Sequence, residues 1–149
     1  MEVKDCMTKN VCFCTPSTNV ADVAKMMCDN HVGCIPVCDE NNCVVGLLTD
    51  RDVILRTISC GKDANTTPVS DIMTCGVCCC KPDTTIDEAT KLMSDFQIRR
   101  IPVCDQNNKI VGMLSLGDLA HNDKKVGQNE VCITLGNICD CGENSKNAE

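Results

Sequence analysis

Two short segments of the chain each carry a hydroxyl and a carboxylate three residues apart. They read GLLTDRD over residues 46–52 and GMLSLGD over residues 112–118, with hydroxyls on Thr49 and Ser115 and carboxylates on Asp52 and Asp118. A hydroxyl residue followed at the third position by an acid is common where a helix begins. The same groups also suit a ribonucleotide, because a helix N-terminus and a hydroxyl can donate to a phosphate while a carboxylate accepts from the ribose diol. The residues alone leave both interpretations open.

The two segments are parts of an internal repeat. Placing Val3 on Val69 aligns residues 3–53 with residues 69–119 without a gap, and about 23 of the 51 positions are identical. Self-similarity of this kind indicates a duplicated structural unit. We therefore predict a first repeat over residues 1–60, a polar linker over 61–68, a second repeat over 69–120, and a C-terminal helix with a polar tail over 121–149.

Each copy predicts the order β-α-β-β-α, an α/β (α+β) fold. The first copy is expected to form strands over 11–14, 34–38 and 43–48, and the second helices begin near Asp50 and Leu116. The preceding helix has apolar residues at helical spacing, which are Val20, Val23, Ala24 and Met27 in one copy and Ile86, Ala89, Met93 and Phe96 in the other. Thr85 with Glu88 predicts a capping box, and Val131, Leu135 and Ile138 predict a further short helix.

A single copy is too small to bury two helices and a three-stranded sheet well. The two copies are therefore expected to pack about a pseudo-two-fold axis and to enclose two equivalent clefts. A duplication kept for stability alone is the alternative.

Composition narrows the classes of partner. The 149 residues include 14 Lys+Arg against 21 Asp+Glu, a formal net charge of -7, and Phe13 and Phe96 are the only aromatic residues. This balance argues against nucleic acid, which needs a basic face or a stacking platform. No apolar run is long enough to cross a membrane, and the start of the chain lacks the pattern of a signal peptide, so a cytoplasmic protein is expected.

The duplicated pattern resembles a known family. With MT at 7–8, TP at 15–16, IPVCDENN at 35–42 and VGLLTDRD at 45–52, it resembles the CBS domain, and the tandem copies resemble a Bateman module of the stand-alone bacterial or archaeal type. The resemblance covers roughly residues 3–120 and includes some likeness to the regulatory insert of IMP dehydrogenase. It implies a regulatory module that binds adenosyl ligands such as AMP, ADP, ATP or S-adenosylmethionine in its clefts.

The resemblance also implies roles for particular residues. Asp52 and Asp118 would bind the ribose hydroxyls, and Thr49 and Ser115 would lie on the phosphate side. The adenine would be flanked by the main chain of two strands, namely Ile35, Pro36 and Val37, and Ile101, Pro102 and Val103. Segments that begin at Thr15 and Lys81 would close over the ligand.

The two copies differ in charge near these positions. Arg99 and Arg100 precede the second IPV segment, where the first copy has Gly33 and Cys34, and Arg51 is replaced by Gly117. An Arg before this strand resembles a phosphate-contacting position of related CBS pairs, and guanidinium groups suit phosphate. The alternative is that these arginines are solvated surface charges. If they bind phosphate, the two clefts are unequal.

The 16 cysteines allow three interpretations. Small buried core residues are one, since Cys12 and Cys14, Cys78 and Cys80, and Cys38 and Cys104 occupy strand positions. A metal site with ligands among Cys75, Cys78 and Cys80 is the second, although the chain offers only one C-x-x-C pair there and its histidines, His31 and His121, lie elsewhere. A disulfide framework is the third. Cys43, Cys60 and Cys75 are expected to be the more exposed thiols.

Together these patterns predict a regulatory protein that is not an enzyme. No nucleophile–base pair, Walker loop or G-x-G-x-x-G is present. The leading hypothesis is a homodimeric adenine-nucleotide sensor that needs no other cofactor and regulates an unknown protein, with the ligand favouring the orientation that closes the cleft. The rivals are a thiol- or metal-responsive protein on a CBS scaffold and a dimerisation module with degenerate clefts.

Overall fold

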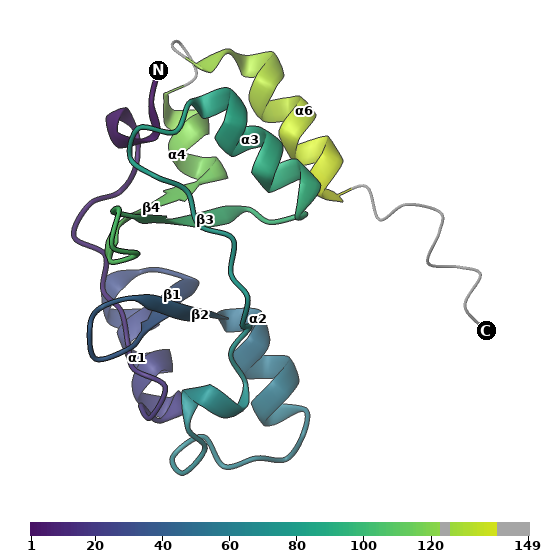
Figure 1. Cartoon of the computed structure of the whole chain (residues 1–149). Coiled ribbons are helices and arrows are strands. Elements are labelled where there is room, and N and C mark those ends of the chain that lie inside the picture. Colours follow the sequence, from purple (N-terminus) through teal and green to yellow (C-terminus); the bar gives the residue numbers. More distant parts are fainter. Residues whose placement is uncertain (123–125, 140–149) are drawn as a thin grey trace. The chain divides into compact units, whose positions relative to one another are not determined.

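The computed structural model of the chain describes residues 1–122 and 126–139 and divides into two compact units (Figure 1). Unit 1 contains residues 1–9, 78–105 and the described residues from 111 to 139, whereas unit 2 contains residues 10–77 and 106–110. Both units combine helices and strands in the order helix, strand, strand, helix, which agrees with the predicted α/β (α+β) fold. None of the described helices combines the length and the hydrophobicity needed to cross a membrane.

Unit 2 is built around one β-hairpin. Its elements are α1 (Val20–Asn30), β1 (Cys34–Cys38), β2 (Val44–Thr49), α2 (Asp50–Val53), the π-helical turn η2 (Ile54–Ile58) and the 3-10 turn η3 (Val69–Asp71). β1 and β2 are antiparallel, with Cys34 opposite Thr49 and Val37 opposite Gly46. Asp39 closes the turn between them, because its Oδ1 accepts from the backbone N–H groups of Asn41 (2.8 Å) and Cys43 (2.9 Å).

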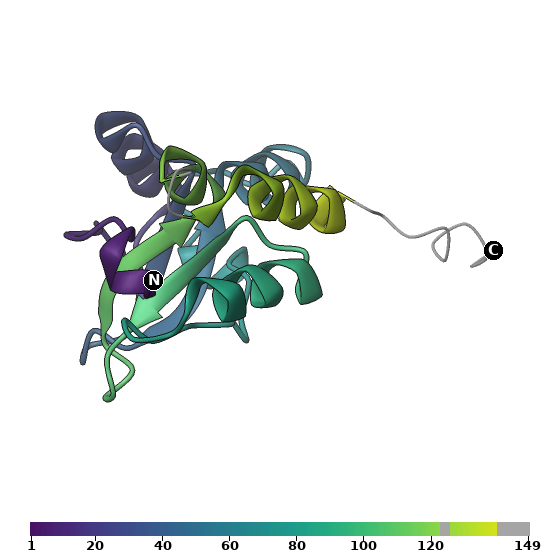
Figure 2. The ribbon, with the colours of Figure 1, turned by 90° about the horizontal axis from the view of Figure 1, so that it is seen from above.

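Unit 1 repeats this plan and adds one helix. Its elements are the 3-10 turn η1 (Val3–Asp5), α3 (Ile86–Asp95), β3 (Arg100–Cys104), β4 (Ile110–Ser115), α4 (Leu116–His121) and α6 (Gln128–Cys139). The predicted C-terminal helix is thus confirmed. It lies beside α3 (Figures 1 and 2), and the Thr90 hydroxyl donates to Glu130 Oε1 across the two helices at 2.9 Å. The predicted polar tail over 140–149 lies outside the described residues.

The predicted strand over 11–14 is wrong, and the sheets have two strands rather than three. Only a single parallel bridge forms, with Cys14 N–H donating to Pro36 O (3.0 Å) and Cys38 N–H donating to Cys14 O (2.8 Å). The next rungs of a parallel ladder would require the N–H groups of Pro36 and Pro16, which proline lacks. Pro102 and Pro82 limit the bridge between Cys80 and Val103 in the same way.

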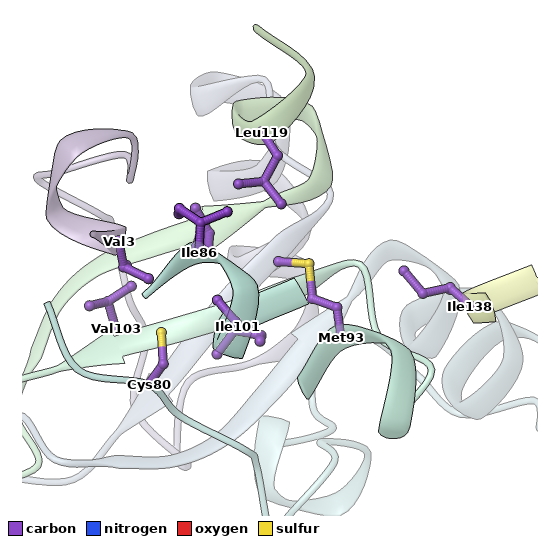
Figure 3. Packing of buried hydrophobic residues seen from close by; sticks show 10 residues of the cluster. Val3, Cys80, Ile86, Met93, Ile101, Val103, Leu119 and Ile138 are labelled. Carbon is purple, nitrogen blue, oxygen red and sulfur yellow. The ribbon is translucent and has the colours of Figure 1, made fainter. Parts of the chain in front are cut away.

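Two positions of the predicted apolar helix faces are also wrong. Ala24 is exposed, and Phe96 is 59% exposed because α3 ends at Asp95 and Gln97 adopts a left-handed conformation (φ 53°). The other predicted positions of α3 are buried in the core of unit 1, where Ile86 and Met93 pack against Ile101 (Figure 3).

The first segment of each repeat packs in the unit formed by the other repeat. Val3 is fully buried in the core of unit 1 (Figure 3), and its counterpart Val69 is fully buried in the core of unit 2. The compact units therefore differ from the sequence ranges 1–60 and 69–120, because residues 1–9 and 69–77 change places.

Paired backbone hydrogen bonds anchor these exchanged segments. In unit 1, Thr8 and Met113 donate to each other's carbonyls at 2.9 Å, and in unit 2 Leu47 and Thr74 do so at 3.0 and 2.9 Å. The close approach requires glycine. A Cβ on Gly112 would lie 2.6 Å from Met7 Sδ and 3.0 Å from Thr8 O, and one on Gly46 would lie 2.7 Å from Met73 Sδ and 3.0 Å from Thr74 O. These contacts explain why both repeats have glycine at this position.

We predict that Gly46→Ala and Gly112→Ala each lower the free energy of unfolding by about 1–3 kcal/mol, the usual cost of overpacking. Urea denaturation followed by far-UV circular dichroism measures this, since the chain has no Trp. Gly136→Ala is the matched control. It lies in α6 with open space at its Cβ, so alanine there should be neutral or stabilising. Equal effects at all three glycines would contradict the packing explanation.

Candidate functional site

The Thr49–Asp52 pair forms a complete capping box at the start of α2. The Thr49 hydroxyl donates to Asp52 Oδ2 (2.9 Å), the Thr49 N–H donates to the same oxygen (3.0 Å), and the Asp52 N–H donates back to Thr49 Oγ1 (3.1 Å). The Asp52 side chain is 15% exposed, and its second oxygen, Oδ1, lies 3.7 Å from Arg56 Nε.

Ser115 and Asp118 repeat this geometry at the start of α4. The Ser115 hydroxyl and N–H donate to Asp118 Oδ2 at 2.6 and 2.8 Å, and the Asp118 N–H donates to Ser115 Oγ at 3.1 Å. Here the second oxygen, Oδ1, accepts from the Thr8 hydroxyl at 3.3 Å. Sequence reasoning missed both Thr8 and Arg56. The Thr8 contact depends on how the exchanged segment packs, whereas Arg56 lies one helical turn after Asp52, so its i,i+4 spacing could have indicated the pair.

The two boxes limit what their hydroxyls can do. Each hydroxyl has one hydrogen, and that hydrogen is donated to the aspartate, so Thr49 or Ser115 must rotate before it can donate to a phosphate. The Oδ1 oxygen of each carboxylate is only partly engaged and retains lone pairs for hydroxyl donors. The structure therefore supports helix capping and leaves the carboxylates able to accept from a diol.

The first turns of the two helices differ in charge. In α2, Asp50 Oδ1 accepts from the Arg51 N–H (2.8 Å), so a second carboxylate covers this end of the helix. In α4 the matching positions are Leu116 and Gly117, and Asp118 is the one acid of the turn. A phosphate would meet less repulsion at α4 than at α2.

The predicted arginines lie at these helix starts. The Leu116 N–H donates to Arg99 O (2.9 Å), which places Arg99 and the adjacent Arg100 near the start of α4, and both are exposed. Arg51 is exposed in the first turn of α2. The structure thus brings Arg99 and Arg100 to the same end of the unit 1 hairpin as Ser115 and Asp118.

The predicted adenine-flanking strand residues belong to the cores. The segments Ile35–Val37 and Ile101–Val103 are buried throughout, and the carbonyls of Pro36 and Pro102 accept from Cys14 and Cys80. Their side chains are thus fixed in place by packing.

Thr15 lies at the other end of β1 from Thr49. A hollow of about 500 Å³ opens there between two loops, lined by Thr15, Pro16, Ser17, Cys38, Asp39, Glu40 and Asn41. Within unit 2 the predicted site residues therefore fall into two groups, with Thr49, Arg51 and Asp52 at one end of β1 and Thr15 at the other. In unit 1, Lys81 Nζ donates to Asp105 O at the corresponding loop end of β3.

Cysteines are distributed between core and surface. Cys14, Cys34, Cys38, Cys80 and Cys104 are buried, whereas Cys60 and Cys75 are exposed and Cys43 is partly so. Burial raises the pKa of Cys14 and of Cys80 to about 12. The described part of the chain contains no group of three His, Cys, Asp or Glu side chains placed to hold a metal ion. Among the cysteines considered as metal ligands from the sequence, Cys75 is exposed to solvent and Cys80 points into the core (Figure 3).

Comparison with known proteins identifies the repeat. The CBS domain matches residues 3–58 and again residues 69–125. The chain belongs to the CBS-domain family. It is 43% identical over 120 residues to the CBS domain-containing protein YhcV of Bacillus subtilis, covering 80% of this chain and 84% of that protein.

Solved CBS-pair structures share the fold. A crystal structure of Hypoxic Response Protein I with two coordinated zinc ions has a TM-score of 0.75 at 25% identity and covers 81% of this chain and 98% of that one. CBSX2 of Arabidopsis thaliana in complex with AMP has a TM-score of 0.71 at 27% identity, covering 85% and 98%. The tandem CBS-pair architecture is thus confirmed, whereas the paired clefts between the copies stay a prediction.

Proposed function

We propose that this CBS pair is a regulatory nucleotide sensor that binds adenosyl ligands through the carboxylates of Asp52 and Asp118. The observation that carries the proposal is that the two aspartate carboxylates are held by the same pattern of hydrogen bonds. Each has Oδ2 held by a serine or threonine hydroxyl and a backbone N–H, which orients the carboxylate and leaves Oδ1 as the less engaged oxygen. A carboxylate held in this way can accept the two hydroxyl hydrogens of a ribose with little loss of side-chain entropy.

Further support comes from chemistry and from a relative. CBSX2, which has the same fold, has been crystallised in complex with the adenine nucleotide AMP. With no Trp or Tyr in this chain, an adenine ring must pack against aliphatic groups and backbone. The metal-responsive alternative, to which the zinc-bound Hypoxic Response Protein I points, has weaker support because the described residues gather no ligand set. We accordingly propose a regulatory rather than catalytic role in the cytoplasm.

Adding AMP or ATP should raise the melting temperature. At a ligand concentration of about 100 times Kd the added stability is about 2.7 kcal/mol, or about 5–11 °C for a protein of this size. Asp52→Ala and Asp118→Ala should each remove part of this shift. Absorbance at 260 nm after desalting reports retained nucleotide directly, because the chain contains no Trp or Tyr to absorb near it.

Glu88→Ala is the matched control for lost capping. Glu88 closes a box of the same geometry with Thr85 at the start of α3, accepting from its hydroxyl (3.0 Å) and N–H (3.1 Å). All three variants should lose about 1 kcal/mol of folding stability, but Glu88→Ala should keep the full ligand shift. An equal ligand shift in all three variants would overturn the role of the aspartates.

We also propose that the two aspartates serve unequal sites, with the more phosphorylated ligand at the Asp118 end. Arg99 and Arg100 lie there, and the acid that covers the second N–H of α2 is replaced by Leu116 in α4. Replacing both arginines by Ala should weaken ATP binding about 10- to 100-fold, the range for losing a charge-assisted hydrogen bond. Adenosine binding should barely change, and Arg51→Ala should have the smaller effect. Isothermal titration with both ligands measures this, and equal losses for ATP and adenosine would contradict the assignment.

We propose that the protein is a homodimer. The α2–η2 segment of unit 2 exposes three large apolar side chains, Ile54 (55%), Leu55 (45%) and Ile58 (67%), which together form an apolar strip typical of interfaces. Ile58→Asp should shift the mass measured by light scattering toward the 16.1 kDa monomer. Ile133→Asp in α6, which changes a similarly exposed isoleucine in unit 1, should leave the mass unchanged. A wild-type monomer would refute the dimer.

A further inference from the structure

Three consecutive cysteines in unit 1 have different surroundings. Cys80 is 4% exposed and points into the core, and burial raises its pKa to about 12 (Figure 3). Partial burial also raises the pKa of Cys78. Cys79, between them, is the exception: a hydrogen bond from the Cys104 thiol and the nearby Lys81 ammonium lower its pKa.

The backbone explains why Cys79 and Cys104 meet. Cys80 pairs with Val103, because the Cys80 N–H donates to Pro102 O (3.0 Å) and the Cys104 N–H donates to Cys80 O (2.9 Å). Neighbouring residues of extended chains alternate between faces. With Cys80 and Val103 turned into the core, Cys79 and Cys104 lie on the opposite face.

Lys81 completes this arrangement. Its Nζ donates to the carbonyl of Asp105, the residue after Cys104, and its positive charge acts on Cys79. A partly exposed sulfur beside a cation and a thiol donor is a typical environment of a reactive cysteine.

We propose that Cys79 and Cys104 form a peroxide-sensitive pair that closes a reversible disulfide. The Cys79 thiolate attacks one oxygen of a hydroperoxide, the O–O bond breaks, and the leaving oxygen takes up a proton. Cys79 is then a sulfenic acid. The Cys104 sulfur attacks it, the S–S bond forms, the S–O bond breaks, and the oxygen leaves as water with the Cys104 proton. With hydrogen peroxide, two thiols and one peroxide give one disulfide and two waters, and a dithiol reductant reverses the bond.

The first repeat supplies an internal control. The positions that match Cys79, Lys81 and Cys104 are Phe13, Thr15 and Cys38, so this repeat has the buried cysteine without the reactive one or the cation. We expect no corresponding bond in unit 2.

Peptide mapping of the full chain tests the proposal. The reduced protein is exposed to stoichiometric hydrogen peroxide, the remaining thiols are alkylated at low pH, and the protein is digested with trypsin. Cys104 is the single cysteine of peptide 101–109, and Cys79 lies in peptide 63–91 with Cys75, Cys78 and Cys80. We expect a cross-link between these peptides that dithiothreitol removes. No cross-link should join peptide 10–25 to peptide 26–51.

Variants assign the partner of Cys104. The cross-link should persist in Cys78→Ser and disappear in Cys79→Ser. In Cys104→Val, which keeps the core filled, Cys79 should accumulate as sulfinic acid instead. Before oxidation, Cys79 should react with iodoacetamide faster than Cys78, because the pKa of Cys79 is lowered and that of Cys78 is raised, so more of Cys79 is thiolate at neutral pH. Circular dichroism confirms that each variant is folded.

Two results would overturn the proposal. One is a cross-link that survives in Cys79→Ser, which would assign the bond to another cysteine of peptide 63–91. The other is wild-type protein that forms no cross-link between peptides 63–91 and 101–109.

Discussion

The fold depends on the close approach of an exchanged backbone segment to the second strand of each hairpin. Thr8 pairs with Met113 in one unit and Thr74 with Leu47 in the other, at a separation that only Gly112 and Gly46 permit. This pairing carries Val3 and Val69 into the two cores, where both are fully buried. Each core is therefore completed by residues from the other repeat. A single repeat lacks the apolar residue that closes its own core, which is a physical reason for the two copies to occur together.

The same exchange places polar groups around the aspartates. The Thr8 hydroxyl donates to Asp118 Oδ1, whereas in the other unit Arg56 lies beside Asp52 and donates to the carbonyl of Ile72 at 2.9 Å. Two carboxylates with identical capping geometry thus have different neighbours, one neutral and one cationic. Together with Arg99 and Arg100, this difference makes the two ends electrostatically unlike although their backbones match.

Proline residues limit how far the chain before each repeat's first helix pairs with the hairpin. Pro16 and Pro36 leave only one rung between the chain at Cys14 and β1, and Pro82 and Pro102 do the same in the second copy. The bridge therefore does not extend into a third strand in either unit. In unit 1 this bridge places Cys80 in the core and Cys79 beside Cys104. The pKa of Cys80 is therefore raised, whereas the pKa of the adjacent Cys79 is lowered.

The sequence by itself determined the duplication, the fold class, the hairpins and the helix starts. These features depend on local patterns: apolar spacing, the Asp39 turn, and a hydroxyl three residues before an acid. It also located Asp52 and Asp118, because a capping box is a local motif. Only the tertiary structure decided that residues 1–9 and 69–77 change places, that Thr8 contacts Asp118, and that Cys79 lies beside Cys104. Each of these contacts joins residues far apart in the chain, and no local propensity encodes such a pairing.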